Sequence, residues 1–194
     1  GARSLASARG SVVAAQLSKA FLPFWNEAFP PLDHHLRSDV FHHDLAPMRQ
    51  ITEVWGPIRY RYATNSLGFK DATVRLVDPR GAGKRLLLMG DSFTQGVGYD
   101  FETSMAGRIA RGLGCRGVDV LNAGLGGYAP SAYWRKLRHL LEEVGLRVDQ
   151  VVVFLDISDI RDELDIYRED PQGALIVPLP EDEGAATRLG HFLR

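Results

Sequence analysis

The sequence Gly-Asp-Ser-Phe-Thr-Gln-Gly at residues 90–96 decides how this chain is interpreted. It directly follows the apolar run Leu-Leu-Leu-Met at 86–89 and precedes a segment with helical periodicity. A short apolar run of this kind is typical of a buried strand, so Ser92 is expected at the carboxyl end of a strand, where the chain turns into a helix. Open α/β sheets bind ligands at that edge. Ser92 is therefore either a nucleophile beside backbone N–H groups or, together with Asp91, part of a helix cap.

The segments that follow the serine predict an alternation of helices and strands. Apolar residues recur every four positions through 101–113 and predict a helix capped by Asp100. A second helix is expected over 131–145, between strands at 118–121 and 151–155, the last of them buried. Strands separated by helices in this order require parallel pairing with right-handed crossovers.

The sequence predicts two parts: an N-terminal helix and irregular segment at 1–58, and an α/β domain at 59–194. The irregular stretch is expected from residue 31 onward because prolines and glycines interrupt it. Within the α/β domain, alternation at 59–62 predicts a strand, and 73–77 is a further short strand candidate.

The composition is typical of one globular domain. The chain has 194 residues, of which 45% are hydrophobic and 24% are charged, and its net charge is −1. A net charge close to zero does not indicate the positively charged surface that binds nucleic acid, so we expect no nucleic-acid partner. No apolar run reaches the length of a membrane span. Cys115 is the only cysteine, which excludes an internal disulfide.

Three loops should meet at the carboxyl edge of the predicted sheet, at Ser92, at Gly127 and at Ser158. A serine hydrolase needs a nucleophile, a base that takes its proton, and donors for the oxyanion of the tetrahedral intermediate. Ser92 is the predicted nucleophile, and the N–H groups of Ser92 and Gly127 are the predicted donors, since glycine lets the backbone approach a substrate closely. The residues predicted to line the substrate are Asp91, Tyr128 and Asp159.

At this point the chain resembles the SGNH/GDSL hydrolase superfamily, over roughly residues 60 to 165. Residues 90–96 are similar to its first sequence block, which bears the nucleophile. Residues 122–128 (Asn-Ala-Gly-Leu-Gly-Gly-Tyr) are similar to the second block, with Gly127 at the oxyanion-hole glycine, and 151–159 to the third. The resemblance implies a three-layer flavodoxin-like α/β fold with a parallel central sheet. It also implies an acyl-enzyme mechanism without a metal or an organic cofactor. By family analogy the location is extracytoplasmic or membrane-associated, and a cytoplasmic location stays open.

The chain departs from the family pattern in two ways. The third block usually carries an asparagine that donates to the oxyanion; here Ser158 stands at that position as a shorter oxyanion-hole donor. The family's catalytic histidine follows an aspartate by three residues near the C-terminus, but His191 follows Arg188. We therefore expect the sequence to be a piece of a longer protein, with an incomplete C-terminal part of the fold.

The one Asp-x-x-His pair in the chain lies on the N-terminal side, at Asp39 and His42. Either His42 acts as the base with Asp39 orienting it, or this segment is structural. Four histidines, at 34, 35, 42 and 43, also raise the question of zinc. They lack the helical i, i+4 pairing of zinc hydrolases, so we expect no metal site there.

The leading hypothesis is a serine esterase that removes an acetyl or short acyl group from a small ester or, by analogy, from an acylated carbohydrate. One alternative is a polysaccharide O-acetyltransferase, in which a sugar hydroxyl replaces water as the acceptor. Another is a non-catalytic binding domain with a decayed site, which Ser158 and the missing C-terminal histidine pair favour. Ser92 and Gly127 favour the two enzymes, because a decayed site has no need of them.

Overall fold

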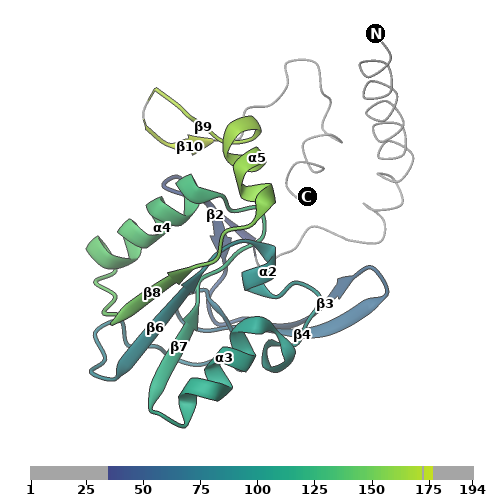
Figure 1. Cartoon of the computed structure of the whole chain (residues 1–194), viewed down its shortest axis with the longest axis vertical. Coiled ribbons are helices and arrows are strands. Elements are labelled where there is room, and N and C mark those ends of the chain that lie inside the picture. Colours follow the sequence, from purple (N-terminus) through teal and green to yellow (C-terminus); the bar gives the residue numbers. More distant parts are fainter. Residues whose placement is uncertain (1–34, 172, 177–194) are drawn as a thin grey trace.

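The computed structural model describes residues 35–171 and 173–176, and the helix expected near the N-terminus lies outside these residues (Figure 1). The elements, in chain order, are β1 (His35–Ser38), β2 (His42–Leu45), β3 (Gln50–Trp55), β4 (Ile58–Thr64), β5 (Lys70–Asp71), β6 (Lys84–Met89), α2 (Ser92–Gln95), the 3₁₀ turn η1 (Phe101–Thr103), α3 (Met105–Gly114), β7 (Val118–Asn122), α4 (Pro130–Glu142), β8 (Gln150–Val153), α5 (Ile157–Asp165), β9 (Arg168–Glu169) and β10 (Leu175–Ile176).

The main sheet has six strands in the order β3-β4-β5-β7-β6-β8. The strands β7, β6 and β8 are parallel, whereas β3, β4 and β5 pair antiparallel with their neighbours. The predicted α/β class is confirmed, but the sheet is mixed and not parallel throughout. The parallel part is the part predicted from the alternation of strands and helices.

The prediction that residues 31–58 are irregular is wrong for most of the described segment. β1 and β2 form an antiparallel hairpin, and β3 joins the main sheet beside β4. The glycine and proline at 56–57, which suggested a break, form the turn between β3 and β4, where Gly56 has a φ of 57°. These breakers mark a hairpin turn, and the residues before them are strand.

Two further predictions need correction. Residues 73–77 form no strand, and the short strand nearby is β5. The helix expected after Asp100 begins later, at Met105, because the Ser104 side chain accepts a hydrogen bond from the Gly107 N–H at 3.2 Å and caps α3. Phe101 lies in η1 instead of in the helix.

Helices cover both faces of the parallel strands (Figure 1). Successive side chains of a strand point to opposite faces, so Leu87 of β6 packs in one core cluster and Leu86 in the other. The first cluster contains Leu140 of α4, and the second contains Ala106 of α3. The sheet is therefore the middle one of three layers.

The predicted third buried strand, β8, is an edge strand. It pairs with β6 and has no second neighbour among the described residues. Val152 and Val153 are 38% and 43% exposed. An apolar run indicates a strand, but it does not indicate whether the strand is central.

A buried lysine of β5 fixes the chain that leaves α2. Lys70 Nζ donates hydrogen bonds to Gly96 O at 2.6 Å and to Tyr99 O at 2.7 Å. It also lies 4.9 Å from the ring centroids of Tyr60 and Tyr62. Burial lowers the pKa of Lys70 to about 8. The carbonyls and aromatic faces compensate for part of the hydration that the ammonium loses.

Within residues 35–171 and 173–176, no helix has both the length and the apolar character needed to cross a bilayer.

Two glycines of α3 give a matched test of this packing. A Cβ at Gly107 would lie 1.8 Å from Phe101 O, whereas a Cβ at Gly112 would meet nothing within 4 Å. We expect Gly107→Ala to lower the free energy of unfolding by about 2 kcal/mol or more, because backbone must move. Gly112→Ala should raise it by about 0.5–1 kcal/mol through helix propensity. Urea denaturation measures both, and equal midpoints for Gly107→Ala and the unchanged protein would contradict the packing described.

Candidate active site

Ser92 lies at the carboxyl end of β6, as the sequence predicts. It is the first residue of α2, and Asp91 caps that helix by accepting a hydrogen bond from the Phe93 N–H at 2.9 Å. The next two parallel strands, β7 and β8, lie on opposite sides of β6. The end of β6 is therefore a point where the strand order reverses, which is where open α/β sheets form ligand crevices.

The loop after β7 approaches α2 very closely. A Cβ at Gly124 would lie 2.6 Å from Thr94 Cγ2, and a Cβ at Gly90 would lie 2.1 Å from Thr94 Oγ1. Only glycine fits at these two positions. This approach brings Gly126 beside Ser92, since a Cβ at Gly126 would lie 3.5 Å from Ser92 Cβ.

Residues 125–128 form a turn, in which the Tyr128 N–H donates to Leu125 O at 3.2 Å. Gly127 has a φ of 80°, a value that the third residue of a type II turn requires and that glycine adopts without strain. The middle peptide of such a turn, here Gly126 C=O and Gly127 N–H, takes no part in the turn's own hydrogen bond. It is available for contacts outside the turn.

Three side chains hold the polar groups of this glycine pair. The Gly126 N–H donates to Gln95 Oε1 at 2.8 Å, and Gly126 O accepts from His43 Nε2 at 2.9 Å. Gly127 O accepts a hydrogen bond from the Tyr167 hydroxyl. Neither Gln95 nor Tyr167 is among the site residues predicted from the sequence. Gln95 stands in the 90–96 segment and is buried, but no sequence signal pairs it with the second loop.

Two backbone N–H groups, one on each of the two loops that meet at Ser92, keep their hydrogen-bonding capacity. Among the described residues, the backbone N–H groups of Ser92 and Gly127 have no acceptor. These are the two groups that the sequence predicts as oxyanion donors. The N–H of Gly126 and the carbonyls of Gly126 and Gly127 all have partners. The Gly127 N–H, which is a predicted oxyanion donor, is the remaining backbone polar group of these two glycines.

The structure does not bring together the predicted pair of Asp39 and His42. The Asp39 side chain is 95% exposed, and its carboxylate lies 3.9 Å from Arg37 Nε. His42 instead shares a hydrogen bond with His43, with 2.8 Å between the two Nδ1 atoms. The residue that reaches the glycine turn is His43, and no sequence signal distinguishes it from His42.

His43 is buried in an aromatic and basic environment. Its ring centroid lies 4.8 Å from that of Tyr128, and its backbone oxygen accepts from the Tyr128 hydroxyl at 2.6 Å. Burial lowers the pKa of His43 to about 3, against the hydrogen bond to the Gly126 carbonyl, and the nearby His42, His35 and Lys136 lower it further. Tyr128 therefore acts as support for His43, although it was predicted to line the substrate.

The tautomers of both histidines follow from this network. Gly126 O can only accept, so the proton of neutral His43 is on Nε2 and its Nδ1 accepts. His42 must then donate from Nδ1, and its Nε2 is the unprotonated nitrogen of a neutral ring. A general base needs such a nitrogen.

The third loop is arranged around a helix cap. Asp156 caps α5 and forms a capping box with Asp159. The Ser158 hydroxyl donates to Asp156 Oδ1, and this hydrogen bond holds the pKa of Asp156 below its usual range. The proton of Ser158 is thus directed at a carboxylate, and the predicted oxyanion-hole position of Ser158 supplies no donor in this arrangement.

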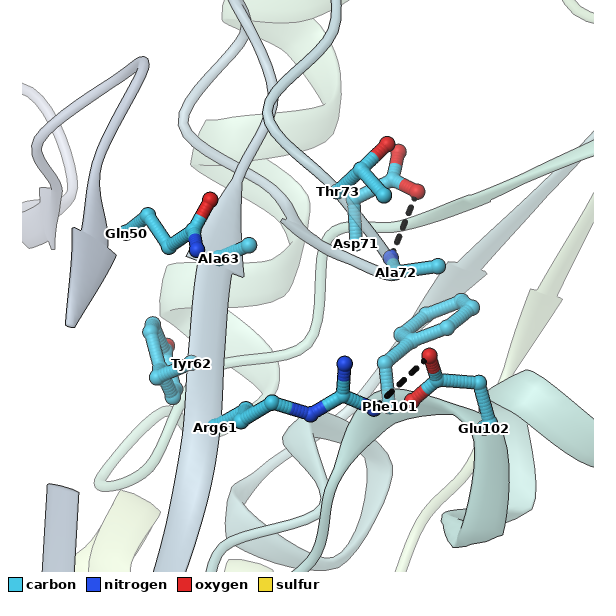
Figure 2. A pocket seen from close by; sticks show the side chains of 9 residues that line it. All are labelled: Gln50, Arg61, Tyr62, Ala63, Asp71, Ala72, Thr73, Phe101 and Glu102. Carbon is cyan, nitrogen blue, oxygen red and sulfur yellow. Dashed lines mark hydrogen bonds and ion pairs between the residues drawn. The ribbon is translucent and has the colours of Figure 1, made fainter. Parts of the chain in front are cut away.

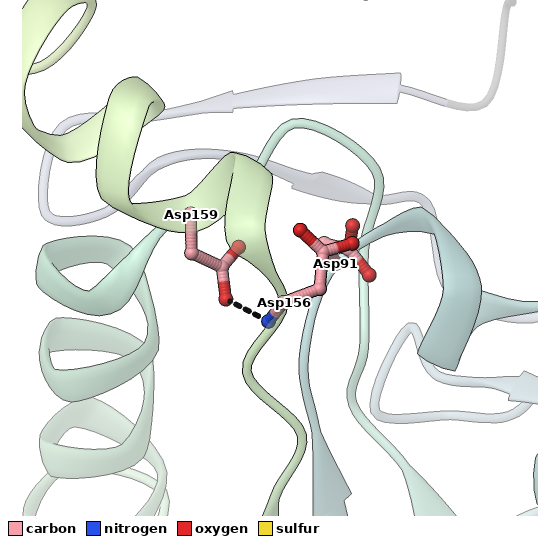
Figure 3. A group of neighbouring side chains, drawn as sticks. All are labelled: Asp91, Asp156 and Asp159. Carbon is pink, nitrogen blue, oxygen red and sulfur yellow. Dashed lines mark hydrogen bonds between the residues drawn. The ribbon is translucent and has the colours of Figure 1, made fainter.

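Asp91, Asp156 and Asp159 lie close together, next to Ser92 in the chain and at the start of α5 (Figure 3). One carboxylate oxygen from each lies within 4.8 Å of the others. Burial, and then the charges of Asp156 and Asp159, raise the pKa of Asp91. Such oxygens could hold a hard cation. Each is also engaged within the protein, as a cap or, at Asp159, by the Tyr133 hydroxyl at 2.9 Å.

A small pocket lies at a different place, between β4 and η1 (Figure 2). Arg61 and Glu102 form an ion pair of 3.1 Å across it. Its lining residues are Gln50, Arg61, Tyr62, Ala63, Asp71, Ala72, Thr73, Phe101 and Glu102. None of them is a predicted site residue, and none of them offers a nucleophile beside a base.

No known protein family matches the chain, and no curated protein is similar to it in sequence.

The lowered pKa of His43 predicts a specific loss of stability in acid. In the unfolded chain the group takes up a proton near its usual pKa of 6.5, whereas in the folded protein it does so near 3. The unfolded state therefore binds more protons between these values, and the free energy of unfolding falls as the pH drops from 6.5 toward 3. The slope from this one group is about 1.4 kcal/mol per pH unit.

Urea denaturation at pH 7.5 and 5.5 measures this effect. In His43→Phe the component of the pH dependence that comes from this group should vanish. His139→Phe is the matched control, because His139 lies on α4 and its ring packs against that of Phe41. An unchanged pH dependence in His43→Phe would show that His43 does not titrate as described.

Proposed function

We propose that the protein is an SGNH-type serine esterase or O-acyl hydrolase with Ser92 as its nucleophile. The observation that carries the proposal is the pair of N–H groups, on Ser92 and Gly127, that have no acceptor in the described part of the chain. They belong to the two loops that meet at the carboxyl end of β6. Three layers and a reversal of strand order at β6 support the proposed flavodoxin-like fold.

In the proposed mechanism, Ser92 Oγ attacks the carbonyl carbon of an acyl ester, and the two N–H groups stabilise the oxyanion that forms. The alcohol leaves, and water hydrolyses the acyl-enzyme. A histidine must take the serine proton. Among the described residues we propose His42 for this role, as the sequence predicts; its Nδ1 shares a hydrogen bond with His43.

A second candidate is a binding domain that has kept the shape of the site without its activity. The Ser158 hydroxyl favours it, because a third oxyanion donor is engaged with Asp156. The small acyl ester or acylated carbohydrate remains the proposed ligand in both cases. Transfer of the acyl group to a sugar hydroxyl differs from hydrolysis only in the acceptor, which competition by added sugar in an ester-cleavage assay would reveal.

Labelling with a fluorophosphonate tests the nucleophile directly. The Ser92 oxygen should form a bond to phosphorus as fluoride leaves, and the labelled protein should lose its turnover of p-nitrophenyl acetate. We expect Ser92→Ala to abolish both labelling and turnover, because Ser92 is the proposed nucleophile where the two loops meet. Ser131→Ala is the matched control, since Ser131 donates to Glu163 on α5. An unlabelled wild-type protein would contradict the esterase proposal and favour a binding domain.

Ser158→Ala tests whether the third loop contributes to the oxyanion hole. Loss of an oxyanion donor costs roughly 10²- to 10³-fold in kcat. Because the Ser158 proton is directed at Asp156, we expect kcat to fall by less than about 3-fold. Steady-state ester hydrolysis measures the change. A fall in kcat of roughly 10²-fold or more would show that Ser158 does act as an oxyanion donor.

A further inference from the structure

A buried histidine holds the peptide that contains the proposed oxyanion donor. His43 Nε2 donates to Gly126 O at 2.9 Å, and the Gly126 carbonyl belongs to the same peptide unit as the Gly127 N–H. All described peptides are trans, and in a trans peptide the C=O and the N–H point in opposite directions. A carbonyl that faces the imidazole therefore directs the Gly127 N–H away from it.

The Gly126–Gly127 peptide depends on a contact that fixes its orientation. The middle peptide of a turn can rotate as a unit between two turn types, by changes in the ψ of the second residue and the φ of the third, and two glycines make this rotation easy. Rotation would exchange the positions of the carbonyl and the N–H. An oxyanion would then meet a carbonyl oxygen in place of a donor.

His43 is itself rigidly placed. Its backbone oxygen accepts from Tyr128, its ring packs on the Tyr128 ring, and its Nδ1 is paired with His42. Only 4% of the residue is exposed. The donor on Nε2 therefore has a fixed position relative to the glycine turn.

We infer that His43 is a positioning residue for the proposed reaction, which sets the orientation of the Gly126–Gly127 peptide and thereby aims the Gly127 N–H at the oxyanion. The inference rests on the proposed function. It assigns His43 no proton transfer to the substrate: its role is to hold a backbone donor in place before the reaction begins, so that no reorganisation is needed in the transition state.

The test compares His43→Phe, which keeps a ring but loses the donor, with His43→Gln, whose amide nitrogen can replace Nε2. We expect His43→Phe to lower kcat for p-nitrophenyl acetate by about 10- to 100-fold with little change in KM. This loss is smaller than that for complete removal of an oxyanion donor, because the Gly127 N–H is still present but no longer held in place. His43→Gln should recover most of kcat. His139→Phe should retain wild-type kinetics. A folded His43→Phe with wild-type kcat would overturn the inference and leave the esterase proposal intact.

A second measurement does not depend on turnover. In long-range ¹H–¹⁵N spectra of the wild-type protein, His43 should appear as the Nε2–H tautomer, and the Nδ1–H tautomer would overturn the inference. In the Ser92 phosphonate adduct, the Gly127 amide proton should move downfield in the wild type and not in His43→Phe. A wild-type protein with neither labelling nor turnover would overturn the proposed function, and this inference with it.

Discussion

The close approach of α2 to the loop after β7 is the constraint on which the site depends. The buried Thr94 side chain fills the space between Gly90 and Gly124, and any side chain at either glycine would overlap it. The Asn122 amide strengthens the contact by donating to Thr94 O at 3.0 Å. Two loops that follow different strands are thereby fixed at backbone distance. A nucleophile on one and a backbone donor on the other can act on one atom only at such a distance.

The surrounding structure holds this contact from both sides. Lys70 binds the carbonyls that follow α2, and Gln95 links α2 to the glycine turn and, through its amide nitrogen, to the Tyr62 hydroxyl at 2.7 Å. Both side chains are buried, and each satisfies backbone groups that would otherwise lose hydration. The antiparallel strands β4 and β5, outside the parallel part of the sheet, thus contribute directly to the geometry at Ser92.

The sequence allowed prediction of the parts of the fold and site that depend on local pattern. The strand, turn and helix around Ser92, the glycine-rich loop at 122–128 and the parallel pairing of the strands follow from apolar periodicity and from glycine. The contact of His43 with Gly126 spans 83 residues, and no local pattern encodes such a pairing. The same is true of the exposure of β8, which depends on how many neighbours a strand has. The error at residues 31–58 arose because glycine and proline mark both loops and hairpin turns.

The electrostatics of the site make the orientation of the backbone donors especially important. Three carboxyl groups, those of Asp91, Asp156 and Asp159, lie close together, and any that is ionised opposes the development of negative charge on a nearby oxygen. Burial raises the pKa of Asp91, which reduces that opposition, while the Ser158 hydroxyl keeps Asp156 ionised. His43 adds no compensating charge, since burial keeps it neutral. In the proposed reaction, stabilisation of the oxyanion therefore depends strongly on oriented N–H dipoles, and a buried, neutral His43 would fix the orientation of one of them without adding a charge that would itself have to be desolvated.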